Sequence, residues 1–175
     1  MSLRPGRTCK SLEKTAWARF SKRRPRKSFV KAMPHRNLNV YNMGDAKAKY
    51  EIQFDLMSAM DQQRRDNAIE SGRQAANKFL EKIIPNEYYF KVRAYPHNVI
   101  RENKMIAGAG ADRLQKGMRK AFGRPTTRGA RMRKGQILFT IKTTKANRAS
   151  VLEAFVRAKK KLGSDFSIVE TQIPN

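Results

Sequence analysis

The spacing of hydrophobic residues changes twice between residues 50 and 95, and this change restricts the fold more than any other feature. From Tyr50 to Leu56, apolar and polar residues alternate, which predicts a half-buried strand. From Asp61 to Ile84, apolar residues recur at intervals of three and four, which predicts an amphipathic helix that Pro85 ends. Alternation returns from Tyr88 to Tyr95. The chain must therefore pack a helix against a sheet.

The predicted helix has an apolar stripe and a charged side. The stripe consists of Ala68, Ile69, Gly72, Ala75, Ala76, Phe79, Leu80 and Ile83. Asp61, Asp66 and Glu70 are expected on the polar side, where they balance nearby arginines.

The remaining elements complete an α+β fold. A short strand is predicted from Pro96 to Ile100, a longer one from Gln136 to Thr143, and a last one from Phe166 to Glu170. A second helix is predicted from Asn147 to Leu162, with Gly163 as its C-terminal cap. Its stripe consists of Val151, Leu152, Phe155, Val156, Lys159 and Leu162. This order predicts a two-layer sandwich, in which two helices cover one face of a mostly antiparallel sheet.

The segment from Arg101 to Lys134 keeps neither a helical nor a strand period. It contains eleven Lys and Arg residues against two acids. Loops of this length in compact domains are usually functional or disordered. Because predicted strands bracket the segment, we expect a long basic loop that projects from the sheet, and we call residues 101–134 the finger.

The positive charge is concentrated in two blocks. The net charge is +25, and residues 1–36 contribute twelve basic residues against one acid. Residues 37–100 and 135–175 are nearly balanced, at +1 and +4. We therefore predict a basic N-terminal extension, residues 1–37, followed by a single domain, residues 38–175, with the projecting loop 101–134. Two separate basic blocks are typical of nucleic-acid binding.

The extension offers a compact set of cations. Pro25 favours an extended path for the surrounding SKRRPRK sequence, which suits a phosphate groove. The residues expected to bind RNA here are Arg4, Arg7, Lys22, Arg23, Arg24, Arg26 and Lys27. Trp17 and Phe20 are compatible either with stacking on RNA bases or with packing on the domain formed by residues 38–175.

Most catalytic and cofactor sites are excluded. Position 113 is Arg where a dinucleotide-binding motif needs glycine, and no phosphate-binding loop is present. One Cys and two His are too few for metal ligation by these residues, so no metal or cofactor is expected. No segment is apolar enough to span a membrane. His97, near Glu102, leaves one enzymatic alternative, general acid or base chemistry on RNA.

The finger also carries a recognisable motif. RENKMIAGAGADRLQKGMRKAFGRP, followed by RMRKGQILFTI, closely resembles a protein family of the archaeal and eukaryotic large ribosomal subunit, called L-ten-e and homologous to bacterial L-sixteen. The resemblance continues through LRPGRTCK, NMGDAKAKYEIQFDL, SGRQAANKFLEK and YYFKVRAYPHNVIRENK. It covers nearly the whole chain and is weakest from Ser11 to Asn39.

The resemblance implies a structural protein of the cytoplasmic ribosome and not an enzyme. Such a protein lies on large-subunit ribosomal RNA beside other ribosomal proteins, with no membrane partner and no homo-oligomer expected. In the family, the loop matching Asn103 to Ala111 points toward the peptidyl-transferase centre and the acceptor end of tRNA. By resemblance, the RNA contacts are Lys104, Arg113, Lys116, Arg119, Lys120 and Arg124; Arg128 and Arg131 are added as further cations of the finger.

The tip of the finger is small and rich in glycine. We expect a flexible tip formed by Met105, Ile106, Ala107, Gly108, Ala109, Gly110 and Ala111. The glycines of the finger, Gly108, Gly110, Gly117, Gly123 and Gly129, are expected to let its backbone approach RNA closely. The alternative function is an RNA-processing or RNA-modifying enzyme, or an assembly factor.

Overall fold

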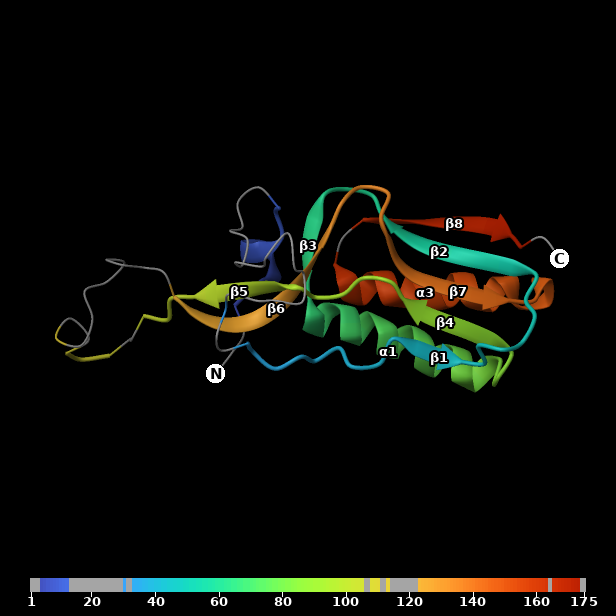
Figure 1. Ribbon diagram of the computed structural model, residues 1–175, viewed down its shortest axis with the longest axis horizontal. Coiled ribbons are helices and arrows are strands. Elements are labelled where there is room, and N and C mark those ends of the chain that lie inside the picture. Colours follow the sequence, from blue (N-terminus) through green and yellow to red (C-terminus); the bar gives the residue numbers. More distant parts are fainter. Residues whose placement is uncertain are drawn as a thin grey trace.

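The computed structural model describes residues 4–12, 30, 33–105, 108–110, 113, 123–163 and 165–173. These residues form a five-stranded sheet covered by two helices, and a three-stranded sheet that extends from one end of it (Figure 1). Every strand pairing is antiparallel. The α+β fold class is confirmed, although the strands divide into two sheets and do not form one.

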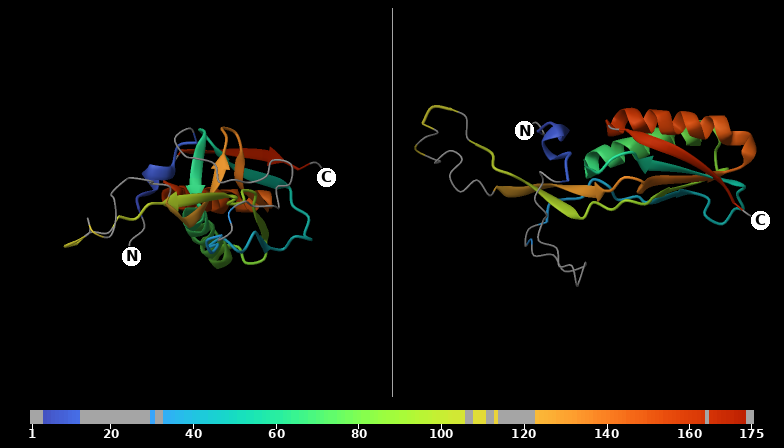
Figure 2. Two further views of the ribbon diagram at one scale, coloured as in Figure 1. Left: turned by 60° about the vertical axis from the view of Figure 1, so that its left-hand side comes forward. Right: turned by 90° about the horizontal axis from the view of Figure 1, so that it is seen from above.

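The five-stranded sheet has the order β1-β4-β7-β2-β8. Its strands are β1 (Asn42–Gly44), β2 (Ile52–Ser58), β4 (Tyr88–Val92), β7 (Ile137–Thr143) and β8 (Phe166–Gln172). The helices α1 (Asp66–Ile83) and α3 (Arg148–Leu162) lie on the same side of this sheet (Figure 2, right). A short 3-10 helix, η2 (Lys145–Asn147), leads into α3. The predicted two-layer arrangement, with both helices on one face, is therefore confirmed.

The main core lies between these helices and the five-stranded sheet. The rings of Phe90 and Phe139 pack edge to face with their centroids 5.2 Å apart, and both side chains are fully buried. The helices approach closely at Gly72, where a Cβ atom would lie 3.3 Å from Cγ of Leu162. Burial alternates along β4, as its sequence pattern predicted. In β2 the predicted apolar residues Ile52, Phe54 and Leu56 are buried, but Asp55 on the opposite face is buried as well and accepts a hydrogen bond from the Thr140 hydroxyl.

The first helix begins later than predicted. Residues 62–65 form a strand, β3 (Gln62–Arg65), and α1 starts only at Asp66. The backbone of β3 pairs with a strand far along the sequence, so tertiary contacts override the local helical period. Two stripe residues were also predicted wrongly. Ile83 and Val156 are 46% and 45% exposed.

Asp66 is buried and does not lie on a polar helix face. Its Oδ2 accepts hydrogen bonds from the backbone N–H and the Nδ2 of Asn37, at 3.0 and 3.2 Å. The carboxylate lies in the first turn of α1, where the helix dipole favours negative charge. It therefore fastens the segment before β1 to the start of the helix.

The finger is shorter than predicted, because its second part is a strand. From here on, the finger means residues 103–123, between the strands that bracket it. The three-stranded sheet has the order β3-β6-β5, with β5 (Asn98–Glu102) and β6 (Arg124–Met132) on either side of the loop. The central strand β6 pairs with both neighbours through backbone hydrogen bonds. Gly129 is packed among these strands, since a Cβ there would lie 3.1 Å from Cγ of Gln63. The atoms closest to Gly129 therefore belong to the protein, so this glycine does not let the backbone approach RNA as expected.

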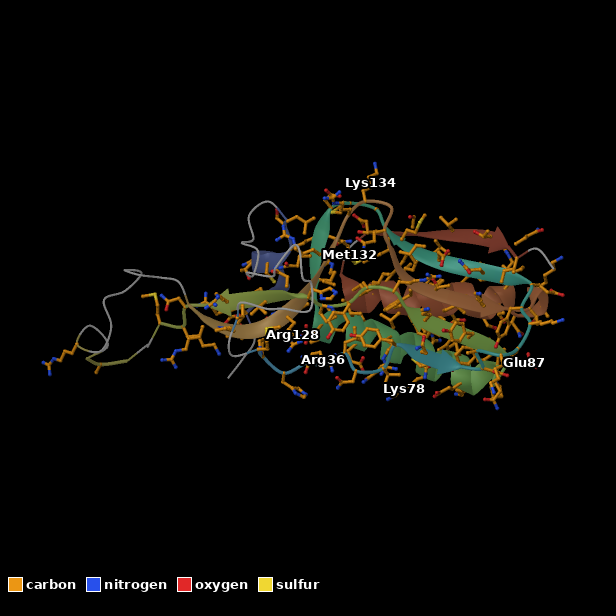
Figure 3. The ribbon with its side chains drawn as sticks, viewed as in Figure 1. Arg36, Lys78, Glu87, Arg128, Met132 and Lys134 are labelled. Carbon is orange, nitrogen blue, oxygen red and sulfur yellow. The ribbon has the colours of Figure 1, made fainter. Side chains whose placement is uncertain are left out.

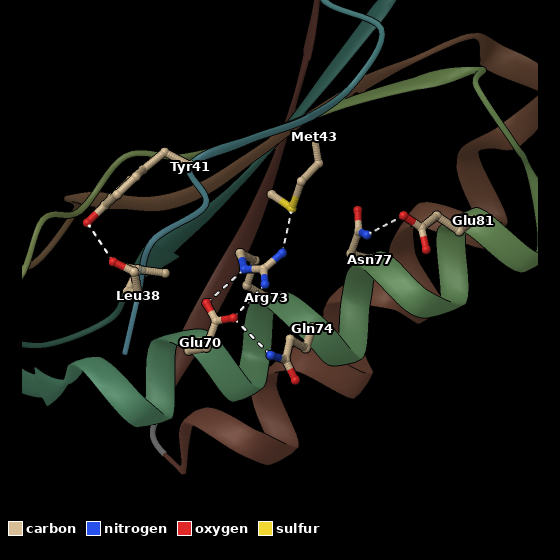
Figure 4. A network of polar contacts seen from close by, with 8 residues as sticks. All are labelled: Leu38, Tyr41, Met43, Glu70, Arg73, Gln74, Asn77 and Glu81. Carbon is tan, nitrogen blue, oxygen red and sulfur yellow. Dashed lines mark hydrogen bonds and ion pairs between the residues drawn. The ribbon is translucent and has the colours of Figure 1, made fainter. Parts of the chain in front are cut away.

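A polar network joins α1 to the strand segment beside it (Figure 4). Arg73 donates a 2.8 Å hydrogen bond from Nε to Oε2 of Glu70, and its Nη1 contacts the Met43 sulfur at 2.9 Å. The side chains of Arg73 and Glu70 are only 10% and 16% exposed. The ion pair predicted between Glu70 and a nearby arginine is thus present, in a largely buried position.

Replacing Glu70 with Gln should lower the free energy of unfolding by about 1 to 3 kcal/mol at neutral pH, because Arg73 loses its charged partner. The hydrogen bond from Arg73 holds the pKa of Glu70 below its ordinary value of 4.5. This stabilisation is therefore present above pH 4.5 and is lost as the pH falls through the lowered pKa. Urea unfolding of both proteins across this range measures the difference.

The matched control is Glu153→Gln, which breaks the exposed pair between Glu153 and Arg157 on α3. These side chains are 53% and 50% exposed, so the change should cost no more than about 0.5 kcal/mol. If the two substitutions had equal effects, the Glu70–Arg73 pair would not stabilise the fold more than a surface pair does.

Candidate nucleic-acid interface

The three-stranded sheet holds the two ends of the finger together. Glu102, the last residue of β5, is opposite Arg124, the first residue of β6. Nη1 of Arg101 donates a 3.3 Å hydrogen bond to the carbonyl oxygen of Gly123. The finger therefore leaves the protein from a closed base, at the end of the molecule farthest from the C-terminus (Figure 1).

Gly123 is at this base and has a left-handed backbone conformation, with φ of +72°. A Cβ atom at this position would lie 2.6 Å from the carbonyl carbon of Glu102 and 2.8 Å from the backbone nitrogen of Asn103. Real Cβ atoms do not approach backbone so closely. Glycine is therefore required for the two ends of the finger to meet.

The N-terminal segment packs against the same sheet. It includes a short 3-10 helix, η1 (Gly6–Cys9), and backbone carbonyl oxygens of the segment accept hydrogen bonds from side chains of β3 and β6. The backbone N–H of Gln63 donates to Lys10 at 2.7 Å, and Nε2 of Gln63 donates to Cys9 at 3.0 Å. Arg65 donates to the carbonyl of Arg4 at 2.7 Å. Residues 4–12 are thus fixed to the sheet that carries the finger.

This packing brings the two basic blocks of the sequence together. Nε of Arg4 lies 3.9 Å from Oε2 of Glu102, at the base of the finger. Arg4 is 55% exposed, so the ion pair itself adds little stability. Its importance is positional, because cations from the start of the chain lie next to those of the finger.

Five of the predicted contact residues are exposed. They are Arg4, Arg7, Lys104, Arg113 and Arg124, which come from the N-terminal segment, the finger and the start of β6. At the tip, Met105, Gly108, Ala109 and Gly110 are also exposed, and a Cβ at either glycine would meet nothing within 4 Å. These positions could meet a polyanion without rearrangement of the core.

Arg128 and Arg131 are half-buried and have a structural task. Nε of Arg128 donates a 2.8 Å hydrogen bond to the carbonyl of Pro34, and Nη2 of Arg131 donates one of 2.8 Å to Leu12. Burial also lowers the pKa of Arg131. Both side chains tie N-terminal segments to β6, so part of each guanidinium is used within the protein.

The remaining predicted contacts lie outside the described residues. In the extension they are Lys22, Arg23, Arg24, Arg26 and Lys27, together with Trp17 and Phe20. In the finger they are Lys116, Arg119 and Lys120, the tip residues Ile106, Ala107 and Ala111, and Gly117.

The residues that anchor this interface were not found from the sequence. Gln62, Gln63 and Asn98 are almost completely buried, and Nδ2 of Asn98 donates to Oε1 of Gln63. Arg64 is also buried and donates to Oε1 of Gln62 and to the carbonyl of Gly163 at the end of α3. Burial lowers the pKa of Arg64. The one sequence signal was a run of four polar residues where an apolar stripe was expected.

His97 and Glu102 do not form a catalytic pair. The extended strand β5 separates them by roughly 16 Å. The imidazole of His97 packs on the ring of Tyr95 with centroids 4.4 Å apart, and Glu102 faces Arg4. The geometry supports binding of an anion around the finger and does not support acid–base chemistry by this pair.

Neither a metal site nor a membrane span was found in the part of the chain that the structure describes. The described residues contain no group of three or more His, Cys, Asp or Glu side chains that could hold a metal ion. Among them there is also no helix long and apolar enough to cross a membrane.

Comparison with known proteins gives a consistent result. Residues 18–169 match the family described as ribosomal protein L16p/L10e. The chain is 38% identical over 173 residues to large ribosomal subunit protein uL16 of Methanococcus maripaludis, covering 98% of this chain and 96% of the relative. It is 38% identical to the protein of the same name from Metallosphaera sedula, covering 97% and 94%. The Staphylothermus marinus protein is 40% identical over 138 residues, covering 78% and 79%.

Proposed function

Because the chain belongs to the ribosomal protein L16p/L10e family, we propose that it is a structural constituent of the large ribosomal subunit. Its partners are ribosomal RNA and neighbouring ribosomal proteins, and it works in the cytoplasm as a structural component and not as an enzyme. A protein in this position needs cations for phosphates and a rigid base for any element that reaches into RNA. The charge distribution and the three-stranded sheet supply both.

The finger is proposed to help position tRNA near the peptidyl-transferase centre. The observation that supports this is the joint placement of both basic blocks around the base of the finger, where Arg4 lies 3.9 Å from Glu102. Cations at the base would hold the ribosomal RNA. The small exposed residues at Gly108, Ala109 and Gly110 could then extend toward the acceptor end of tRNA.

The proposed contacts fall into two groups. Exposed cations around the base, such as Arg7 and Arg124, have the guanidinium geometry that binds phosphate with two hydrogen bonds. Arg128 and Arg131 belong to the same proposal, although each also donates a hydrogen bond to a backbone carbonyl within the protein. The division into an extension, residues 1–37, and a domain, residues 38–175, is also part of the proposal, and the complete burial of Leu38 supports it.

Deletion of residues 105–111 tests the role in tRNA positioning. We expect the variant to fold and to enter large subunits, because shortening a loop between fixed ends costs little closure entropy. We expect aminoacyl-tRNA binding by the reconstituted ribosomes to fall. Thermal unfolding of the free protein, co-sedimentation with large subunits and a tRNA-binding assay measure the three properties.

The matched control is Lys134→Ala, which removes an exposed cation from the β6–β7 turn, away from the finger (Figure 3). This variant should retain tRNA binding. If deletion of residues 105–111 left tRNA binding unchanged, the positional role would be wrong. If the deletion prevented folding, the loop would belong to the core.

A further inference from the structure

Three aromatic rings form a stack away from the finger, and we call Tyr41, Tyr95 and His97 the aromatic cluster. The Tyr41 and Tyr95 rings are 5.7 Å apart and nearly parallel, at 16°. His97 contacts Tyr95 at 4.4 Å, with the ring planes tilted by 44°. Tyr95 and His97 are in the connection between β4 and β5, which joins the two sheets, and Tyr41 immediately precedes β1. His97 is exposed, whereas the tyrosines are half-buried.

Two arginines flank the aromatic cluster. Nη1 of Arg36 donates a 2.7 Å hydrogen bond to the Tyr95 hydroxyl. Nε of Arg128 donates a 2.8 Å hydrogen bond to the carbonyl oxygen of Pro34, two residues before Arg36. This bond holds the Arg128 guanidinium close to Arg36 (Figure 3). Burial raises the pKa of Tyr41 to about 12, and the positive charges of Arg36 and Arg128 oppose this rise. Cζ of Arg36 also lies 5.8 Å from the centroid of the Tyr95 ring, so this cation is held against the aromatic cluster.

The acid that acts on Tyr41 does not neutralise this surface. Asp66 also acts on Tyr41, but its side chain is fully buried and its Oδ2 is occupied by two hydrogen bonds from Asn37. Although His97 is exposed, neighbouring protein atoms shield part of the ring from water, and this desolvation lowers the pKa of the imidazole from its ordinary value of 6.5, which favours the neutral form at pH 7. A planar group could cover this imidazole without removing a positive charge from water. The surface combines an accessible ring with two fixed cations.

This combination suits an unpaired nucleotide. Proteins recognise unstacked RNA bases by stacking them on aromatic or histidine rings, and arginine binds the adjoining phosphate. Tyrosine and arginine are also common at protein interfaces, but the net charge of +25 favours a polyanion over a protein as the occupant of this surface. We propose that the aromatic cluster is a second RNA-binding surface, where an unpaired base of ribosomal RNA stacks on His97 and its phosphate binds Arg36 and Arg128. This inference rests on the proposed function as a protein that binds ribosomal RNA.

Substitution of His97 tests the stacking. His97→Ala should weaken binding of the full chain to deproteinised large-subunit ribosomal RNA by about tenfold, which corresponds to the stacking of one base. His97→Phe keeps a ring and should bind as the wild type does. Filter binding measures both affinities. Ultraviolet crosslinking should place an RNA adduct on His97 or Tyr95 of the wild type.

Two controls separate the possible results. The thermal unfolding midpoint of free His97→Ala should equal that of the wild type, since the side chain is exposed. Arg124→Ala, at the base of the finger, should weaken RNA binding independently of the aromatic cluster. If Arg124→Ala weakened binding and His97→Ala did not, the inference that the aromatic cluster binds RNA would be overturned, while the proposed function would still hold. If the wild type bound no ribosomal RNA, both would fail.

Two further outcomes would also overturn the inference. Equal weakening by His97→Ala and His97→Phe would mean that the aromatic ring is not what binds. Crosslinks from the aromatic cluster to a neighbouring protein in intact subunits, without an RNA adduct, would identify a protein-docking surface instead.

Discussion

Replacing Gly123 with alanine is expected to lower the free energy of unfolding by about 2 to 4 kcal/mol and to misplace the finger. The φ of +72° strains any residue with a Cβ atom, and that atom would lie 2.6 Å from the Glu102 carbonyl carbon. The contact is with backbone, so rotation of a side chain cannot relieve it. The pairing of Glu102 with Arg124 should therefore open, and the finger should lose its direction.

Gly110→Ala is the matched control, because Gly110 has a similar φ of +76° but nothing lies within 4 Å of its added Cβ. It should cost about 1 to 2 kcal/mol at most, from backbone strain alone. Chemical denaturation measures both variants, and hydrogen exchange of the Glu102 and Arg124 amides reports on the base of the finger. Equal costs at the two glycines would show that the close approach at Gly123 is unimportant.

Removal of three exposed cations around the base of the finger should have the largest effect on RNA binding. The triple variant Arg7→Ala, Lys104→Ala and Arg124→Ala should lower affinity for large-subunit ribosomal RNA by roughly two to three orders of magnitude near 0.1 M salt. Each lost phosphate contact should also reduce the slope of log affinity against log salt concentration by about 0.7 to 0.9. A salt titration of binding measures both quantities.

The charge-matched control removes three exposed lysines, Lys47 and Lys49 between β1 and β2 and Lys145 in η2. The connection between β1 and β2 lies at the end of the sandwich opposite to β5 and β6 (Figure 1). It lowers the net charge equally, so a nonspecific charge effect would weaken both triple variants to the same extent. We expect the control to keep nearly the full salt slope. An unchanged slope in the first variant would remove Arg7, Lys104 and Arg124 from the interface.

The strands and helices of the five-stranded sandwich could be predicted because each has its own period of apolar residues. Phe54, Phe90 and Ile141 face the helices, and their polar neighbours in sequence point to the other face. The three-residue strand β1 is too short to show such a period and was not predicted. The local pattern was sufficient to predict an element wherever one of its faces packs into the hydrophobic core, because that face must consist of apolar residues.

Two of the three strands in the smaller sheet could not be predicted in this way, whereas the third, β5, overlaps the short strand predicted from Pro96 to Ile100. β3 was read as the start of a helix and β6 as part of a loop, because neither alternates apolar and polar residues. In the three-stranded sheet, the side-chain amides of Gln63 and Asn98 are buried. They are hydrogen-bonded to each other, and Gln63 also donates to the N-terminal segment. Buried amides satisfied by hydrogen bonds leave no periodic signal in the sequence.

The sequence by itself determined the class of partner. Two basic blocks beside a nearly neutral body require a polyanion, and the long motif of the finger identified the family that the comparisons later supported. Charge and motif can be read from the order of residues alone, because neither depends on which residues are in contact in the folded chain.

Only the tertiary structure decided which cations are available and where they gather. Arg4 and Arg124 are exposed near the base of the finger, whereas Arg128 and Arg131 also fasten N-terminal segments to β6. These contacts join residues that lie about a hundred positions apart, through hydrogen bonds to backbone carbonyl groups that every residue possesses. Because any sequence could supply such acceptors, only the folded chain shows which ones are used.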